Sequence, residues 1–318
     1  MEADLSAHFL WNIDPVMFSV VGRDIRWYSF FYFLVFLTGY MLWHWQMRRG
    51  GHGEVATSRL LLWMLVGLLV GARLGHCLFY EPEFYLSHPL EILNLSRGGV
   101  SSHGGTIAIF LTLYLYSRRY EYSFPEMADR ISFATMFGAA LVRFGNFFNS
   151  EIVGREWYGP WAVRFPRFTA HIQEVWERSN GPLDWTAQPL PRHPVQLYEA
   201  LGIWCVLAVL FIVDRRYGEN RPRGLLAGLF CGLYFAIRFS VEFWKEYLRF
   251  HEFVPDAAQQ VIRVIPTAGL TLGQWLSLPF IAIGVTIWFW ALRARLPAAQ
   301  LSRWDDAEAL VAQRPKRS

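Results

Sequence analysis

The sequence predicts an all-α polytopic membrane protein with about seven transmembrane helices and a small extracytoplasmic head. Apolar residues make up 53% of the 318 residues and charged residues only 18%, against roughly 25% charged residues in an average soluble protein. Aromatic residues make up 17%, including 15 tryptophans, which is typical of aromatic belts at two membrane interfaces. We therefore expect most of the chain to lie in a bilayer.

Seven apolar segments are long enough to cross a bilayer as helices, because a crossing needs roughly 20 residues. They cover about residues 28–45, 60–80, 98–116, 131–149, 196–213, 224–244 and 272–292. We expect residues 1–296 to form one transmembrane domain, with a head of about residues 150–195 between the fourth and fifth segments. This head is rich in Pro, Gly, Trp and Arg. Residues 297–318 are expected to form a polar and mobile cytoplasmic tail.

The basic residues predict the orientation of the chain. The regions after the first, third, fifth and seventh segments hold 16 of them, against 11 on the opposite side. Because cytoplasmic loops carry an excess of Lys and Arg, the N-terminus is expected outside and the C-terminus inside. The first 15 residues contain no basic residue, so we expect no cleavable signal peptide.

Composition argues against several classes of partner. Cys77, Cys205 and Cys231 each lie in an apolar run without a pairing pattern, and the nine histidines show no metal-ligand spacing, so we expect no metal and no cofactor. The net charge of +4 is spread along the chain, which does not indicate nucleic-acid binding.

Ionisable residues inside the predicted helices indicate where the chemistry lies, since each costs roughly 2.5 to 3.5 kcal/mol to insert. Arg143 and Asn146 are three residues apart, and Arg238 and Glu242 four apart, so each pair shares a helix face. An ion pair that only fixes helix register explains Arg238 and Glu242 equally well. The wider set of polar residues in or near these segments comprises Arg73, His103, Arg143, Asn146, Asn149, Glu151, Arg238 and Glu242. The topology places all of them except Arg73 toward the outer face.

Two arginines at the level of lipid headgroups suit a phosphate, because a guanidinium offers a fork of donors that matches phosphate oxygens. The glycine pairs on either side of His103, at residues 98–99 and 104–105, would let the backbone approach a ligand closely. A flexible connector into the third segment is the alternative interpretation of these glycines.

Seven sequence blocks in order resemble one known family. RFGNFFNSEIVGR, residues 143–155, is similar to the signature of the prolipoprotein diacylglyceryl transferases. Six further blocks match family motifs: RWYSFFY at 26–32, GARLGHCLFY at 71–80, GGVSSHGG at 98–105, RHPVQLYEA at 192–200, IRFSVEFWK at 237–245 and TLGQWLSLP at 271–279. The chain differs from the family pattern at Val142 (usually small), Ser150 (usually Gly), Ser102 (usually aromatic) and Lys245 (usually Arg).

The resemblance implies that the transmembrane domain is catalytic, in the inner membrane of a bacterium, with its active site toward the outer face. Its substrates would be phosphatidylglycerol and the lipobox cysteine of a prolipoprotein signal peptide, and membrane lipids would surround it. The thiol would displace glycerol 1-phosphate from the glycerol carbon and form a thioether, which is the first step of lipoprotein maturation. Such a substitution needs no nucleophile from the enzyme.

On this interpretation Arg143 and Arg238 bind the phosphate and stabilise the leaving group. His103 either accepts the thiol proton, which suits its ordinary pKa near 6.5, or is a structural histidine. Tyr28, Asn146 and Glu151 would orient the headgroup hydroxyls or the arginines, and Glu242 would hold Arg238 in place. Gly154 would allow close approach of the substrate. The residues expected to attach the head to the fifth helix are His193, Gln196, Tyr198 and Glu199.

Two other functions remain open. A lipid transporter would also place arginines at headgroup level, but it predicts polar residues between both leaflets, whereas the inner halves of these segments are almost wholly apolar. An intramembrane hydrolase needs a Ser–His or paired-Asp constellation, which the segments do not contain.

Overall fold

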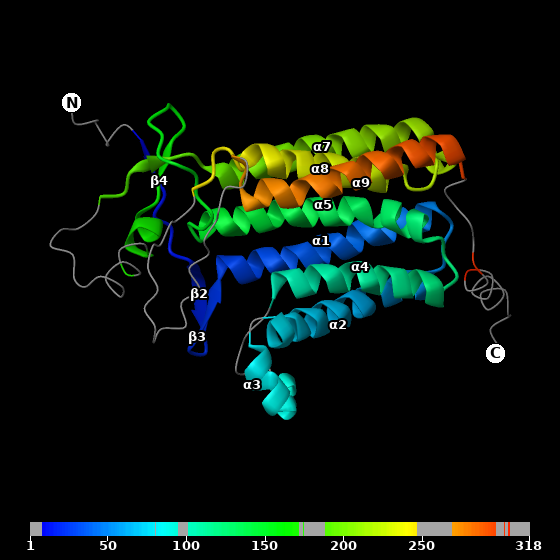
Figure 1. Ribbon diagram of the computed structural model, residues 1–318, viewed down its shortest axis with the longest axis horizontal. Helices are drawn as coiled ribbons and strands as arrows, with labels where there is room; N and C mark the ends of the chain where they lie inside the picture. The colour runs from blue at the N-terminus through cyan, green and yellow to red at the C-terminus, as the bar shows by residue number, and fades with distance from the viewer. Residues whose placement is uncertain are drawn as a thin grey trace, which may run out of the picture. The chain divides into compact units, whose positions relative to one another are not determined.

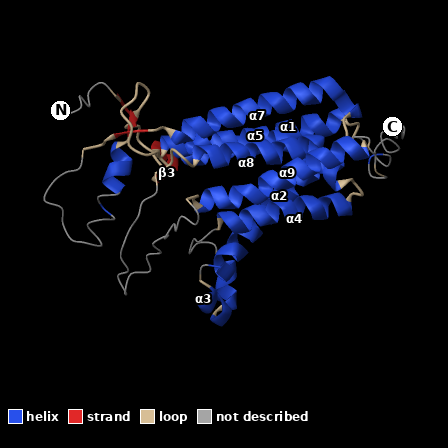
Figure 2. Cartoon of the chain, turned by 45° about the horizontal axis from the view of Figure 1, so that its top comes forward, coloured by secondary structure: helices blue, strands red, loops and turns tan. Residues whose placement is uncertain are grey.

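The computed structural model describes residues 8–79, 81–94, 101–171, 174, 188–246, 269–296, 302 and 305, without the side chains of 55, 56, 102, 103, 106 and 272. Helix dominates the described residues (Figure 2). The chain forms two compact units. Unit 1 comprises Met1–Gly39, Ala134–Ile212 and Gly228–Trp288, and unit 2 comprises Tyr40–Phe133, Val213–Ala227 and Phe289–Ser318.

A helix lies at each of the seven predicted segments (Figure 1). These helices are α1 (Trp27–Arg49), α2 (Glu54–Phe79), α4 (Ser102–Arg119), α5 (Phe124–Phe148), α7 (Val195–Tyr217), α8 (Leu225–Val241) and α9 (Leu272–Ala294). Four helical segments, in α2, α5, α7 and α9, are long and apolar enough to cross a membrane. Helix α8 is apolar but has only 17 residues. That α1, α4 and α8 also cross the membrane stays a prediction.

Short strands occur that the all-α prediction did not include. In unit 1, β4 (Val163–Arg164) pairs in parallel with β1 (Phe9–Leu10) and antiparallel with β5 (Pro191–Arg192). This small sheet joins the N-terminal segment to two parts of the predicted head, one inside it and one near its C-terminal end. A hairpin of β2 (Val16–Val20) and β3 (Arg23–Arg26) leads directly into α1. Strands of two to five residues are too short to show an alternating pattern in the sequence.

In unit 2, α2 and α4 pack with almost no space between their backbones. A Cβ on Gly75 would lie 2.6 Å from Cα of Gly104, and one on Gly71 would lie 2.1 Å from Cβ of Ala108. Ser101 caps α4 by accepting a hydrogen bond from the Gly104 N–H at 3.2 Å. Gly104 was predicted to admit a ligand; instead it is helical and admits the neighbouring helix. Gly98 and Gly99 lie outside the described residues.

Arg73 also has a structural role in unit 2. It is 3% exposed, and it donates hydrogen bonds to the carbonyls of Glu91, Ile92 and Asn94 at 2.8–2.9 Å. These carbonyls belong to or follow the 3-10 helix η2 (Pro89–Leu93), which comes after α3 (Pro82–Ser87). Arg73 therefore fixes this connection between α2 and α4, and its cost of burial is offset by charge-assisted hydrogen bonds.

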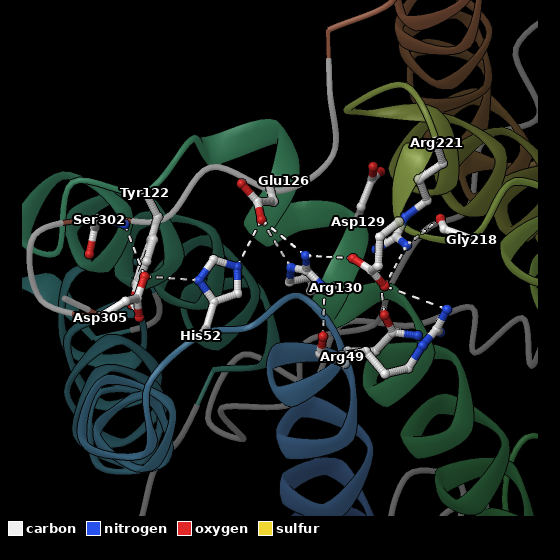
Figure 3. A network of polar contacts seen from close by, with 12 residues as sticks. Arg49, His52, Tyr122, Glu126, Asp129, Arg130, Gly218, Arg221, Ser302 and Asp305 are labelled. Carbon is white, nitrogen blue, oxygen red and sulfur yellow. Dashed lines mark hydrogen bonds and ion pairs between the residues drawn. The ribbon is translucent and has the colours of Figure 1, made fainter. Parts of the chain in front are cut away.

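A buried polar network occupies the other end of unit 2 (Figure 3). Arg130 is fully buried and donates to Glu126, to the Gln46 carbonyl and to Glu219. Arg221, also fully buried, donates to Asp214 at 3.1 Å. Asp129 accepts from the backbone N–H groups of Gly224 and Ala227 at 2.8 and 2.7 Å, so it stabilises the start of α8.

The described part of the C-terminal tail is anchored in this network. The Asp305 carboxylate accepts hydrogen bonds from the N–H groups of Gly53 (2.7 Å) and Ser302 (2.9 Å) and from the Tyr122 hydroxyl (2.8 Å). It also lies 3.2 Å from Nδ1 of His52, whose Nε2 lies 2.8 Å from Glu126. The prediction of a mobile tail is therefore wrong for Asp305. Its carboxylate is buried, and these contacts hold it in place and compensate for the loss of its hydrogen bonds to water.

Candidate active site

Two of the predicted arginines share one buried carboxylate in unit 1. Glu199 of α7 lies with its Oε1 3.0 Å from Nε of Arg143, which projects from α5. The same carboxylate accepts two hydrogen bonds of 3.0 Å from Nη1 of Arg238, which projects from α8. The Glu199 side chain is only 3% exposed. The structure thus brings Arg143 and Arg238 to one carboxylate, and their predicted role in phosphate binding stays a prediction.

The sequence interpretation missed the contacts of Glu199 with the two arginines. It was expected to attach the head to α7, and Glu242 was expected to support Arg238. In the structure Glu199 is the ion-pair partner of Arg238, and Glu242 accepts from the Thr271 hydroxyl at 3.4 Å and lies 3.8 Å from Nζ of Lys245. No local spacing indicates the Glu199 contacts, because its partners lie on other helices.

A chain of hydrogen bonds continues from Arg143 to the end of α5. Arg143 Nη1 donates to Asn146 Oδ1 at 3.0 Å, and Asn146 Nδ2 donates to Glu151 Oε2 at 3.3 Å. Gln196 of α7 donates to the Glu151 carbonyl at 2.6 Å. Arg143 and Asn146 share a helix face, as their i, i+3 spacing predicted, and are in contact. The predicted orienting role of Asn146 stays a prediction.

Two further groups lie within electrostatic range of this cluster. The Tyr28 hydroxyl interacts with the charges of Arg143 and Glu151, and its ring packs against α5 at Gly145. Lys245, just beyond α8, interacts with the charges of Glu242, Arg238, Glu199 and Arg143. Burial lowers the pKa of the Lys245 ammonium, and the two arginines act in the same direction, whereas the carboxylates oppose this effect.

Gly154 is required by protein packing. A Cβ at this position would lie 2.5 Å from the Cβ and carbonyl oxygen of His193 and 2.8 Å from the Trp244 carbonyl. The Gly154 N–H donates to the His193 carbonyl at 2.9 Å. The predicted close approach at Gly154 is therefore made by the protein chain itself. It holds the segment after Glu151 against residues just before α7 and just after α8, all within unit 1.

The remaining residues of the predicted head contact are structural, as expected. His193 stacks on Trp157 at a ring separation of 4.4 Å, and its Nδ1 lies 3.0 Å from the Tyr198 hydroxyl. The Trp161 indole donates to the same hydroxyl at 2.8 Å. Burial lowers the pKa of His193, so this histidine is neutral at pH 7 and its ring serves as a hydrogen-bonding and stacking surface.

The helix position of His103 is described, but its side chain is not. It is the second residue of α4, directly after the cap at Ser101. Its predicted role as proton acceptor falls on a side chain outside the described set and stays a prediction.

The two arginines keep donors that the described residues do not use. Arg143 Nη2 and Arg238 Nε and Nη2 donate no hydrogen bond within the described part of the chain, and Nε of Arg143 is close to Glu199 but not aligned for a hydrogen bond. Their side chains are 14% and 25% exposed. A phosphate that approaches this point would therefore meet two fixed cations with free N–H groups.

Over the described residues, no group of three His, Cys, Asp or Glu side chains could hold a metal ion. The fixed charges and amides of the described site can bind and stabilise an anion.

Four apolar helical segments long enough to cross a membrane define a helical membrane protein, and two of its partly exposed arginines share a buried carboxylate. The chain belongs to the prolipoprotein diacylglyceryl transferase family, whose model matches residues 15–290. It is therefore a transferase, and the family predicted from the sequence is confirmed.

Several relatives carry the name phosphatidylglycerol–prolipoprotein diacylglyceryl transferase. The protein of Chloroherpeton thalassium is 37% identical over 91% of this chain and 97% of its own length. The proteins of Tolumonas auensis and Nitrosomonas europaea are 36% and 35% identical over 87% and 89% of this chain, and over 95% and 91% of their own lengths. The similarity therefore extends over nearly the whole of each relative.

Proposed function

We propose that this chain transfers the diacylglyceryl group of phosphatidylglycerol to the lipobox cysteine of prolipoproteins. The observation that carries this proposal is the meeting of Arg143 and Arg238 at Glu199, with unused N–H donors on both guanidinium groups. A single lipid phosphate can accept from both. The names of the relatives supply the two substrates, and the site supplies the charge that the reaction requires.

The reaction is a substitution at saturated carbon. The cysteine sulfur attacks the glycerol carbon that bears the phosphate, a C–S bond forms and the C–O bond breaks. The oxygen keeps the electron pair and leaves as glycerol 1-phosphate, and the thiol proton passes to a base. Negative charge grows on the phosphate as the bond breaks, so fixed cations in a water-poor site lower the barrier.

His103 is the proposed base. A cysteine thiol has an ordinary pKa of about 8.5 and is mostly protonated at neutral pH. A histidine with an ordinary pKa near 6.5 accepts a proton at this pH. Tyr28, Asn146 and Glu151 orient the headgroup hydroxyls or the arginines, and the Glu242 carboxylate lies within electrostatic range of Arg238.

The location follows from the same proposal. The protein is a multi-pass protein of the bacterial inner membrane with its N-terminus outside and its C-terminus in the cytoplasm. The active site then faces outward, where an exported prolipoprotein presents its lipobox.

A transfer assay tests the proposal. Purified protein in detergent is given phosphatidylglycerol and a lipobox peptide, and the peptide mass and released glycerol phosphate are measured together. Transfer predicts one mole of glycerol phosphate for each diacylglyceryl group gained by the peptide. Release of free fatty acid would instead support a hydrolase, and binding without turnover would support a transporter.

A matched peptide with serine in place of the lipobox cysteine is the control. The substitution removes the nucleophilic sulfur but keeps the shape, so it should give neither product. Release of glycerol phosphate with the serine peptide would contradict the proposed attack by sulfur.

A further inference from the structure

We propose that Glu199 is a positioning residue that sets the geometry of the two phosphate-binding guanidinium groups. The inference rests on the proposed function and adds a residue that the reaction requires. Glu199 does not touch the substrate on this view; it acts through Arg143 and Arg238.

The geometry of the carboxylate supports this role. Its two oxygens accept from one nitrogen of Arg238, and one oxygen also lies 3.0 Å from Nε of Arg143. Three helices, α5, α7 and α8, each supply one of these three side chains, and all three residues lie in unit 1. A single buried carboxylate thus ties together arginines that local spacing does not bring together.

Which nitrogens are engaged also matters. Glu199 occupies Nη1 of Arg238 and lies at Nε of Arg143, while Asn146 takes Nη1 of Arg143. Nη2 of Arg143, together with Nε and Nη2 of Arg238, donates no hydrogen bond to the described residues. The tether therefore restrains both cations but leaves one edge of each for a phosphate oxygen.

Glu199 also affects the affinity for an anionic lipid. Its negative charge lies against both guanidinium groups, so it opposes binding of a resting phosphodiester. The same carboxylate keeps the two cations in place as charge develops on the leaving group. The charge of Glu199 also opposes the growing negative charge of the leaving group, so the expected gain in kcat comes from the fixed placement of the two cations.

The test is the Glu199→Gln variant in the transfer assay, with kcat and the KM for phosphatidylglycerol measured separately. The amide keeps the size of the side chain but removes its charge. We expect kcat to fall about 10- to 100-fold because the guanidinium groups lose their fixed separation. We expect KM for phosphatidylglycerol to stay constant or fall, because a competing negative charge is gone.

Two further variants separate positioning from a purely structural role. Glu199→Asp keeps the charge on a shorter side chain and should restore part of the lost kcat relative to Glu199→Ala. The control Glu156→Gln removes a carboxylate that pairs with Arg192 at 3.5 Å in the same unit, and it should leave both constants unchanged. Thermal unfolding of each variant identifies any loss of folded protein.

The outcomes are distinct. If the wild-type protein gives no coupled products, the proposed function fails. If it turns over and Glu199→Gln has the wild-type kcat, the positioning role fails. A raised KM with unchanged kcat, or an Asp variant no more active than the Ala variant, would likewise overturn the inference.

Discussion

The Asp305→Asn substitution should release the C-terminal tail and destabilise unit 2. The carboxylate is 3% exposed and accepts hydrogen bonds from Gly53, Ser302 and Tyr122 in addition to its contact with His52. Burial raises the pKa of Asp305, but these hydrogen bonds outweigh burial and lower its pKa to about 2 from the ordinary 3.8. The difference corresponds to about 2 kcal/mol of stability at neutral pH.

The network also predicts the pH dependence of that stability. Burial lowers the pKa of His52, but hydrogen bonds to Asp305 and Glu126 outweigh burial and raise it, although Arg130 opposes them. The contribution of His52 is therefore complete below pH 6.5 and is lost as the pH rises through its raised pKa. The contribution of Asp305 is complete above pH 3.8 and is lost as the pH falls toward 2. Stability from this network should be highest between about pH 4 and 6.5.

The measurement is thermal unfolding in detergent between pH 4 and pH 9, for the wild type and for Asp305→Asn. The variant should have a lower Tm at neutral pH, and its alkaline loss of stability should be smaller and complete at a lower pH because His52 has lost a partner. Release of the tail is measured separately as the rate of maleimide labelling of Ser302→Cys, with Cys205 and Cys231 replaced by alanine. The exposed Asp24→Asn variant is the control. Equal Tm values and labelling rates in Asp305→Asn and wild type would refute this account.

Three other predictions concern the site. Arg143→Ala should remain folded and lose at least about 100-fold in turnover, measured as coupled release of glycerol phosphate; full activity would contradict the leaving-group role. His103→Gln should lose turnover most severely at neutral pH. If this variant instead turns over at the rate of the wild type from about pH 6 to 8, His103 is a structural residue. Ser150→Gly should raise the stability by about 1 kcal/mol, because Ser150 has φ of +56° and a buried hydroxyl without a partner; a lower Tm in this variant would show that the serine is not strained.

The sequence predicted the parts of the site that depend on local spacing. The apolar segments coincide with helices, and the i, i+3 pair Arg143 and Asn146 is in contact at 3.0 Å. The left-handed backbone at Ser150 explains why the family usually has a glycine at that position, because glycine adopts positive φ without strain.

The sequence did not predict the contacts that depend on the packing of distant segments. Glu199 follows Tyr198 in a block that attaches the head, and Tyr198 makes the expected head contacts. Adjacent residues on a helix point about 100° apart, so Glu199 faces a different set of neighbours. Arg238 is 39 residues away along the chain, and only the packing of α7 against α8 brings the two together.

Burial of arginines alone does not identify the site, since unit 2 holds arginines that are more deeply buried. Arg130 and Arg221 have fully buried side chains, and Arg130 donates from Nε, Nη1 and Nη2 to described residues. Arg143 and Arg238 are 14% and 25% exposed and keep unused donors. In unit 2, contacts within the network compensate for the cost of burying these cations. In unit 1, the unused N–H groups of the two arginines can still donate hydrogen bonds to an anion. Arg221 also has a buried Nε without a hydrogen-bond partner among the described residues, so unused donors alone do not distinguish the two groups. Partial exposure together with unused donors distinguishes Arg143 and Arg238 and makes them the candidates for anion binding.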